Sequence, residues 1–253
     1  MKPTFEILQL TSLIEEGLTT FVEKTSTIEI GKYESVVESR IILNLCLRYF
    51  ESINLLAKND FVNLPSAMVL GRSLFESAIN ILWILHPDNI FECESRFLAR
   101  LKKYEDWISD QIKFFNLQKW NSDAFINQKE QINHFIIALE KLLLEKGQRL
   151  TQVPNFRAML KTIGEERKYL YYKLLSGFIH GGYYATTVYR KNLGWCKEFG
   201  EFIDVNDWKL IYSVTWPVFE ISSELFIEKA TFSRIKNIYS DDFKIEIRKT
   251  LKI

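Results

Sequence analysis

Two charged residues interrupt a long apolar segment and share one side of a helix. The segment 64–85 contains only two charged residues, Arg72 and Glu76, and a separation of four places both on one helical face. A helix that is apolar nearly all round is buried nearly all round, and an unpaired buried ion is strongly unfavourable. We therefore expect both side chains to be buried and to be paired with each other or with a third group.

A second group of polar residues follows about 100 residues later. Tyr172, Ser176 and His180 are spaced by four, so they form one polar stripe on a helix whose other residues are mostly apolar. His180 stands before two glycines, which end the helix and leave the imidazole accessible to a group that approaches closely. Placed opposite Glu76, His180 could act as a general acid or base near neutral pH.

Two interpretations of these residues stay open. In the first, Arg72, Glu76 and His180 form a catalytic centre, with Tyr172 and Ser176 in support. Such a centre supplies a base that takes a proton and a cation that stabilises negative charge in a transition state. In the second, Arg72 and Glu76 fix the register of the helices, and His180 is a hydrogen-bonded core residue. Both interpretations predict that the two polar stripes face each other across two helices.

The two motifs together resemble a family of bacterial all-helical domains of unknown function. That family carries Arg-x3-Glu on one helix and Tyr-x3-Ser-x3-His on a later helix, and the resemblance covers roughly Val36 to Thr186. The chain is also distantly similar to HEPN-like helical bundles, many of which are ribonucleases of bacterial toxin or phage-defence systems. The resemblance implies an antiviral or toxin-type effector that binds or cleaves RNA without a metal ion, with Arg72, Glu76 and His180 at the site.

The sequence departs from the HEPN ribonuclease motif in one respect. That motif has an arginine and a histidine a few residues apart in one helix, whereas no arginine stands in this relation to His180. Lys173 precedes His180 by seven residues, and Arg72 would have to supply the cation from another helix. The alternative is therefore a non-catalytic interaction or sensor module, which would act as a homodimer or with a partner protein.

Basic and aromatic residues alternate after the second stripe and suggest an RNA-binding surface. Cations can hold phosphates while aromatic rings stack on bases. In the competing interpretation, the rings pack this segment onto the helices and the charges are solvated. The candidate RNA-binding residues are Lys173, Tyr183, Tyr184, Arg190 and Lys191, with Trp195 close behind.

The composition argues against several other classes of site. A net charge of +1 gives no global field that would attract nucleic acid, so only a local basic patch could do so. The three histidines, His86, His134 and His180, are dispersed, and the Glu-x-x-His motif of di-iron bundles is absent from the sequence. The sequence also lacks a glycine-rich phosphate-binding loop. We therefore expect neither a metal site nor a cofactor.

The cysteines and the N-terminal residues predict a cytoplasmic protein without membrane contact. Cys46, Cys93 and Cys196 are far apart and never form a Cys-x-x-Cys pair, which fits a reducing compartment. Acidic residues stand where a signal peptide would carry basic ones. No uncharged apolar run reaches the ~18 residues that a membrane span needs.

Long helices with short polar breaks should position these residues. With only 10 Gly and 5 Pro, the chain favours an all-α bundle of about eight or nine helices in one domain, 1–253, with its core at about 29–232. A segment near 182–206, rich in Tyr and Thr, should be irregular or a hairpin. The expected helices lie at about 4–24, 29–58, 64–86, 90–120, 123–147, 154–164, 165–180, 207–232 (kinked at Pro217) and, as an amphipathic C-terminal helix, 241–252.

Overall fold

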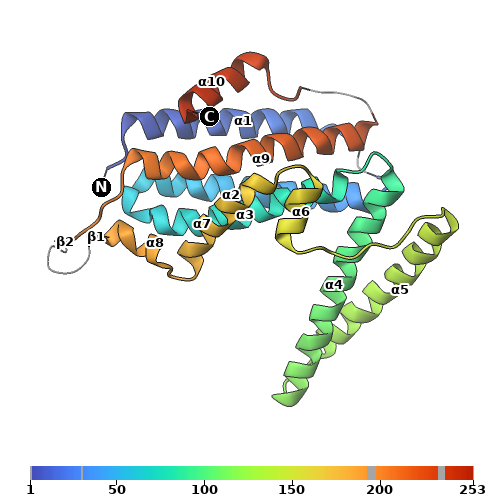
Figure 1. The fold of residues 1–253 in the computed structure, drawn as a ribbon. Helices are drawn as coiled ribbons and strands as arrows, with labels where there is room; N and C mark the ends of the chain where they lie inside the picture. Colours follow the sequence, from blue (N-terminus) through green and yellow to red (C-terminus); the bar gives the residue numbers. More distant parts are fainter. Residues whose placement is uncertain (1, 30, 193–197, 233–236, 253) are drawn as a thin grey trace.

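Ten α-helices make up most of the described part of the chain, so the all-α prediction is confirmed. The computed structural model describes residues 2–29, 31–192, 198–232 and 237–252. Within these ranges, a pair of two-residue strands is the only sheet. Figure 1 shows the long helices side by side in the body of the molecule, with a helical hairpin that leaves it.

α3 (Leu64–Leu85) is the central helix of the body. It begins with Pro65 in its first turn, where a missing N–H costs nothing, and ends before Pro87. Most of its side chains are buried, and it packs against α2 (Glu34–Asn59) and α9 (Val205–Thr231). By length and composition, the stretch Phe61–Leu85 is apolar enough to cross a membrane. An 18-residue window within it has a mean hydropathy of 1.4, but 67% of that window is buried inside the fold.

α1 (Phe5–Thr25) also belongs to the core, although the core was expected to begin near residue 29. Its apolar residues, Ile7, Leu10, Ile14 and Phe21 among them, are fully buried against α2 and α9. α10 (Asp241–Leu251) lies over α1 and α9 and buries Phe243, Ile247 and Leu251, as its amphipathic pattern predicts. Helices from both ends of the chain therefore close the same side of the body (Figure 1).

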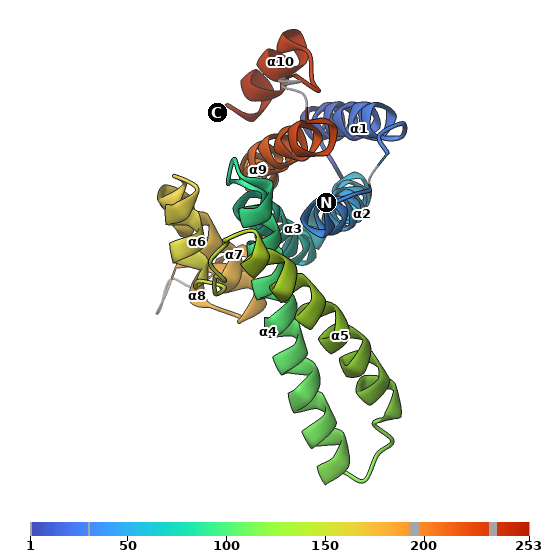
Figure 2. The same cartoon turned by 90° about the vertical axis from the view of Figure 1, so that its right-hand side faces the viewer.

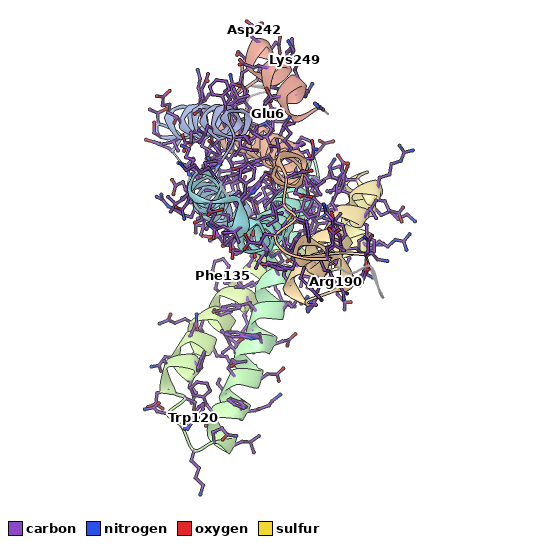
Figure 3. All side chains as sticks on the ribbon, turned by 90° about the vertical axis from the view of Figure 1, so that its left-hand side faces the viewer. Glu6, Trp120, Phe135, Arg190, Asp242 and Lys249 are labelled. Atoms are coloured by element: carbon purple, nitrogen blue, oxygen red, sulfur yellow. The ribbon has the colours of Figure 1, made fainter. Side chains whose placement is uncertain are left out.

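α4 (Ile90–Leu117) and α5 (Asp123–Glu145) form a helical arm. Figure 2 shows the two helices extending together away from the body, and Figure 3 places Trp120 at the tip of the arm. Phe97 and Phe135 meet near its base, with ring centroids 6.4 Å apart. Towards the tip, apolar side chains are exposed, including Leu117 at 80% and Trp120 at 56%.

The segment between the arm and α9 consists of short elements. They are α6 (Phe156–Thr162), the 3-10 turn η2 (Glu166–Lys168), α7 (Tyr169–Ile179), α8 (Tyr183–Thr186), the 3-10 turn η3 (Thr187–Tyr189), β1 (Arg190–Lys191) and β2 (Glu198–Phe199). β1 and β2 pair in antiparallel fashion, which confirms a hairpin in the predicted irregular segment. Two details differ from expectation: α7 starts four residues later than 165, and the Tyr-rich residues 183–186 are helical instead of extended. Trp195 and Cys196 lie outside the described residues.

α9 starts two residues earlier than expected because Asp204 and Asp207 form a reciprocal capping box. The helix then continues through Pro217 to Thr231.

Cys46 and Cys93 are buried, free thiols. Burial raises the pKa of the Cys46 thiol to about 12 and that of Cys93 to about 11, so both are poor nucleophiles at neutral pH.

Close packing at Gly17 sets how α1 meets α9 and α10. A β-carbon at Gly17 would lie 2.8 Å from Cζ of Phe243 and closer still to the ring of Trp216. We expect Gly17→Ala to lower the free energy of unfolding by about 1–3 kcal/mol, because two rigid rings must move. Urea denaturation measures this change. The matched control is Gly177→Ala in α7, where an added β-carbon would meet nothing within 4 Å outside its own helix turn, so alanine should be neutral or slightly stabilising. Equal effects of the two substitutions would contradict the packing argument.

Candidate functional site

Arg72 is the centre of a polar cluster at the contact between α3 and α7. Its Nη1 donates a hydrogen bond to Oγ of Ser176 at 2.7 Å, and its Nη2 donates to Oε1 of Glu76 at 2.8 Å. The guanidinium also lies over the ring of Tyr172, 4.2 Å from the ring centroid. We call these four residues, Arg72, Glu76, Tyr172 and Ser176, the Arg72 cluster. Two hydrogen bonds and a cation–π contact together hold a charge that is only 9% exposed.

Neighbouring groups fix the orientation of the cluster. The hydroxyl of Ser176 donates to the backbone carbonyl of Tyr172 at 2.6 Å, so its oxygen is free to accept from Arg72. The ring of Tyr172 stacks on Phe156 of α6 at 4.4 Å, and Phe156 in turn contacts Phe75 of α3. The cluster therefore joins three elements, α3, α6 and α7.

The predicted facing of the two polar stripes is confirmed for these four residues. Arg72 is buried and paired, as the apolar character of α3 requires. Glu76 differs from the prediction because its side chain is 35% exposed. The reason is a cavity that lies beside it.

The predicted position of His180 is not seen. His180 is exposed, and among the described residues no hydrogen bond or ion pair joins its side chain to Arg72 or Glu76. α7 ends at Ile179, and His180 follows as the C-cap residue, with its backbone N–H bonded to the carbonyl of Ser176. Gly181 then takes a positive φ of 60° and turns the chain. The imidazole therefore stands at the end of α7, outside the Arg72 cluster.

The three basic residues among the predicted RNA-binding residues each lie over a different aromatic ring. The guanidinium of Arg190 lies 4.9 Å above the ring of Tyr183, and both residues lie close to His180 in the sequence. The ammonium of Lys191 lies over Phe202 at 4.5 Å, and that of Lys173 over Tyr169 at 5.4 Å.

The two tyrosines of α8 are only partly engaged. Tyr184 packs edge-on against Phe178 at 5.8 Å, which supports the alternative that these rings hold the segment onto the helices. Tyr183 and Tyr184 nevertheless remain exposed by 57% and 45%. The exposed ring of Tyr183 and the guanidinium over it form a small aromatic and basic surface, and Tyr183 follows His180 by three residues in the sequence.

A cavity of about 440 Å³ opens beside Glu76, between α3, α4 and α6. Glu76 and Asn80 line it from α3, and Phe156 lines it from α6. From α4 it receives Arg100, Lys103, Tyr104 and Trp107. The sequence analysis missed these four residues, although their spacing of i, i+3, i+4 and i+7 places them on one helical face and is a readable signal.

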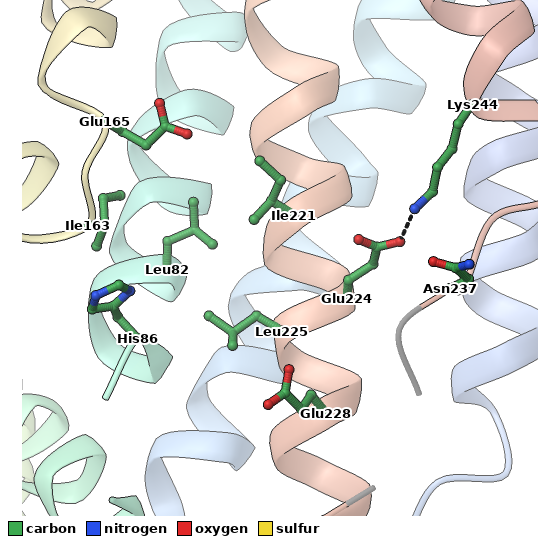
Figure 4. A pocket seen from close by; sticks show the side chains of 10 residues that line it. All are labelled: Leu82, His86, Ile163, Glu165, Ile221, Glu224, Leu225, Glu228, Asn237 and Lys244. Carbon is green, nitrogen blue, oxygen red and sulfur yellow. Dashed lines mark hydrogen bonds and ion pairs between the residues drawn. The ribbon is translucent and has the colours of Figure 1, made fainter. Parts of the chain in front are cut away.

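A second cavity, of about 500 Å³, lies between α3, α9 and α10 (Figure 4). Glu165, Glu224 and Glu228 contribute carboxylates to its lining, and Lys244 pairs with Glu224 at 2.6 Å. In the part of the chain that the structure describes, no group of three or more His, Cys, Asp or Glu residues is placed to hold a metal ion. This cavity therefore provides no metal centre among those residues.

An all-helical protein built around a buried arginine cluster is the class that the fold and the site define. Residues 41–196 match the model of a family of unknown function, DUF5677, and the chain belongs to this family. The matched part runs from α2 to beyond β1 and contains the whole Arg72 cluster, the arm and His180. No curated protein and no solved structure matches the chain. The family match supports the expected resemblance to an uncharacterised domain family, whereas HEPN-likeness and a bacterial source stay predictions.

The geometry of the cluster predicts opposite outcomes for two substitutions. Arg72→Ala should lower the free energy of unfolding by about 2–4 kcal/mol, because it removes two hydrogen bonds and leaves Glu76 without its cation. His180→Ala should change it by no more than ~0.5 kcal/mol, because the side chain is exposed and has no hydrogen bond or ion pair with any described residue. Chemical denaturation of both purified variants tests this pair. A stable Arg72→Ala variant would show that the cluster contributes nothing to the fold.

Proposed function

We propose that this protein is a non-catalytic interaction or sensor module, in which the Arg72 cluster is structural. One observation carries this proposal: both terminal nitrogens of the Arg72 guanidinium are bonded to protein partners, while its Nε is buried without one. Nη1 and Nη2 are bonded to Ser176 and Glu76, and Tyr172 lies over the guanidinium. A catalytic cation must instead present its donors to the charge that develops on the substrate.

The position of His180 supports the same proposal. A general base must reach the proton that it removes within a hydrogen-bond length, or through one water. The backbone of His180 bonds to Ser176, but among the described residues no hydrogen bond or ion pair joins its imidazole to Arg72 or Glu76, so cation and base lack the direct contact that one centre needs.

The arm supports an interaction role. Its helices expose several large apolar side chains near the tip, among them Phe114, Leu117 and Trp120. Contiguous exposed apolar surface commonly marks a site of protein interaction.

The proposal predicts that the cluster matters for stability and not for turnover. Purified protein incubated with cellular RNA should leave the RNA intact on a denaturing gel. Arg72→Lys should reduce the melting temperature, since an ammonium cannot make both hydrogen bonds in the same planar geometry. RNA cleavage that disappears in an Arg72→Lys variant with an unchanged melting temperature would contradict the proposal.

A HEPN-like, RNA-cleaving effector of a bacterial toxin or phage-defence system is the second candidate. The observation in its favour is that the imidazole of His180 is exposed and is followed within ten residues by exposed Tyr183 and Tyr184 and by Arg190, which lies over Tyr183. Here His180 would take the proton of a ribose 2′-hydroxyl, and Arg190 would stabilise the phosphate without a metal ion. Arg72, Glu76, Tyr172 and Ser176 would position α7 instead of contacting RNA.

This candidate makes its own prediction. Transfer RNA should be cleaved in the presence of EDTA, and His180→Ala should abolish cleavage while the melting temperature stays the same. Gel electrophoresis of the RNA gives the readout, with His134→Ala as a control because His134 is an exposed histidine on α5. Intact RNA, or cleavage that does not depend on His180, would rule the candidate out.

A further inference from the structure

Arg100, one of the cations that line the cavity beside Glu76, has a buried nitrogen atom without a protein partner. Nη1 of Arg100 is buried and has no hydrogen-bond partner. Burial lowers the pKa of Arg100, and attraction to Glu38 opposes this shift, although no ion pair within 4.0 Å joins the two among the described residues. Nη1 of Arg40, Nε of Arg72 and Nε of Arg190 are also buried without a partner, but among these four arginines only Arg100 lines this cavity, where a ligand could supply an acceptor to its guanidinium.

A second cation stands on the same face of α4. Lys103 lies three residues after Arg100, lines the same cavity and is exposed. Among the described residues, no ion pair or hydrogen bond occupies its ammonium group. Two unoccupied cations on one wall match an anionic group such as a phosphate.

Flat aromatic rings form another part of the lining. Tyr104 and Trp107 stack nearly parallel, with centroids 5.5 Å apart and an angle of 13°. Trp107 is 47% exposed, and Gln128 of α5 donates a hydrogen bond to the hydroxyl of Tyr104 at 3.1 Å. Phe156 lines the cavity from α6. Such rings offer stacking surfaces to a planar ligand.

Hydrogen-bond acceptors lie on the α3 side. Only Oε1 of Glu76 is bonded to Arg72, and the amide nitrogen of Asn80 is bonded to the carbonyl of Glu76. The second oxygen of Glu76 and the side-chain oxygen of Asn80 can therefore accept from N–H groups of a ligand.

We infer that this cavity binds a nucleotide, whose phosphate meets Arg100 and Lys103 and whose base stacks on the ring of Trp107. The base would direct its N–H groups to Glu76 and Asn80. A volume of about 440 Å³ suits a ligand of this size. The ligand class includes a free nucleotide and the terminal residue of an RNA chain, because both present the same phosphate, sugar and base. The inference rests on the proposed sensor function and names its ligand class.

The cavity shares one side chain with the Arg72 cluster and contacts another of its residues through Phe156. Glu76 belongs both to the cavity and to the Arg72 cluster, and Phe156 stacks on Tyr172 of that cluster. A bound nucleotide would thus touch two side chains that hold α7.

Isothermal titration of the full chain with adenosine, guanosine, cytidine and uridine 5′-monophosphates tests the inference. At least one should bind, and more tightly than inorganic phosphate. Arg100→Met and Lys103→Gln should weaken binding by about tenfold or more, since each removes a charged donor. Trp107→Leu should weaken binding by a factor of about 5 or more through lost stacking.

A short single-stranded RNA, titrated in parallel, distinguishes the free nucleotide from the chain terminus. The ligand that binds more tightly identifies the source.

Two matched variants serve as controls. Arg40 also has a buried, unpartnered Nη1, but it lies over Phe21 and Phe226 and does not line this cavity. Trp120 is an exposed tryptophan at the tip of the same arm. Arg40→Met and Trp120→Leu should leave the dissociation constant within about twofold of wild type.

Two results would overturn the inference: no heat of binding with any nucleotide or with the RNA, or binding that is indifferent to Arg100→Met, Lys103→Gln and Trp107→Leu. Chromatography of the nucleotide after incubation separates this inference from the proposed function. Unchanged nucleotide agrees with both, whereas a converted nucleotide contradicts the non-catalytic function and leaves the binding site intact.

Discussion

The buried charge of Arg72 is the constraint on which the arrangement around α7 depends. α3 is enclosed by other helices on most sides, so the one cation in its middle must find partners inside the fold. Glu76 supplies one from the same helix, while Ser176 and Tyr172 supply the others from α7. α7 is short and buries only Leu175 completely. Its attachment therefore relies on this polar contact more than the long helices do.

α4 has two roles along its length. Its first half packs on the body and buries Cys93, Phe97 and Leu98, whereas its second half leaves the body with α5 as the arm. The cavity beside Glu76 lies where the helix passes from one role to the other. Arg100 is desolvated by burial there and, among the described residues, has no carboxylate partner within 4.0 Å. The same junction places aromatic rings of the arm beside acceptors of the core.

Much of the fold and part of the site could be predicted from the sequence, and the limits have physical causes. Helical spacing predicted that Arg72 and Ser176 lie on facing stripes, because residues four apart share a face whatever the tertiary structure. His180 escaped the prediction because a stripe holds only while the helix continues, and α7 ends one residue before it. The exposure of Glu76 depends on α4 and α6, which meet α3 only through long-range packing. The spacing of Arg100 and Trp107 predicts that they share a helical face. The charges on that face, however, are typical of an ordinary solvent-exposed helix, so the spacing alone does not indicate a binding site.

The central claim is that Arg72 holds α7 to the core through Ser176. A double-mutant cycle of Arg72→Met and Ser176→Ala, read out as the free energy of unfolding, tests this claim most directly. The account predicts a coupling energy of about 1 kcal/mol or more, since both single variants remove the same buried, charge-assisted hydrogen bond. Additive effects of the two substitutions would contradict it.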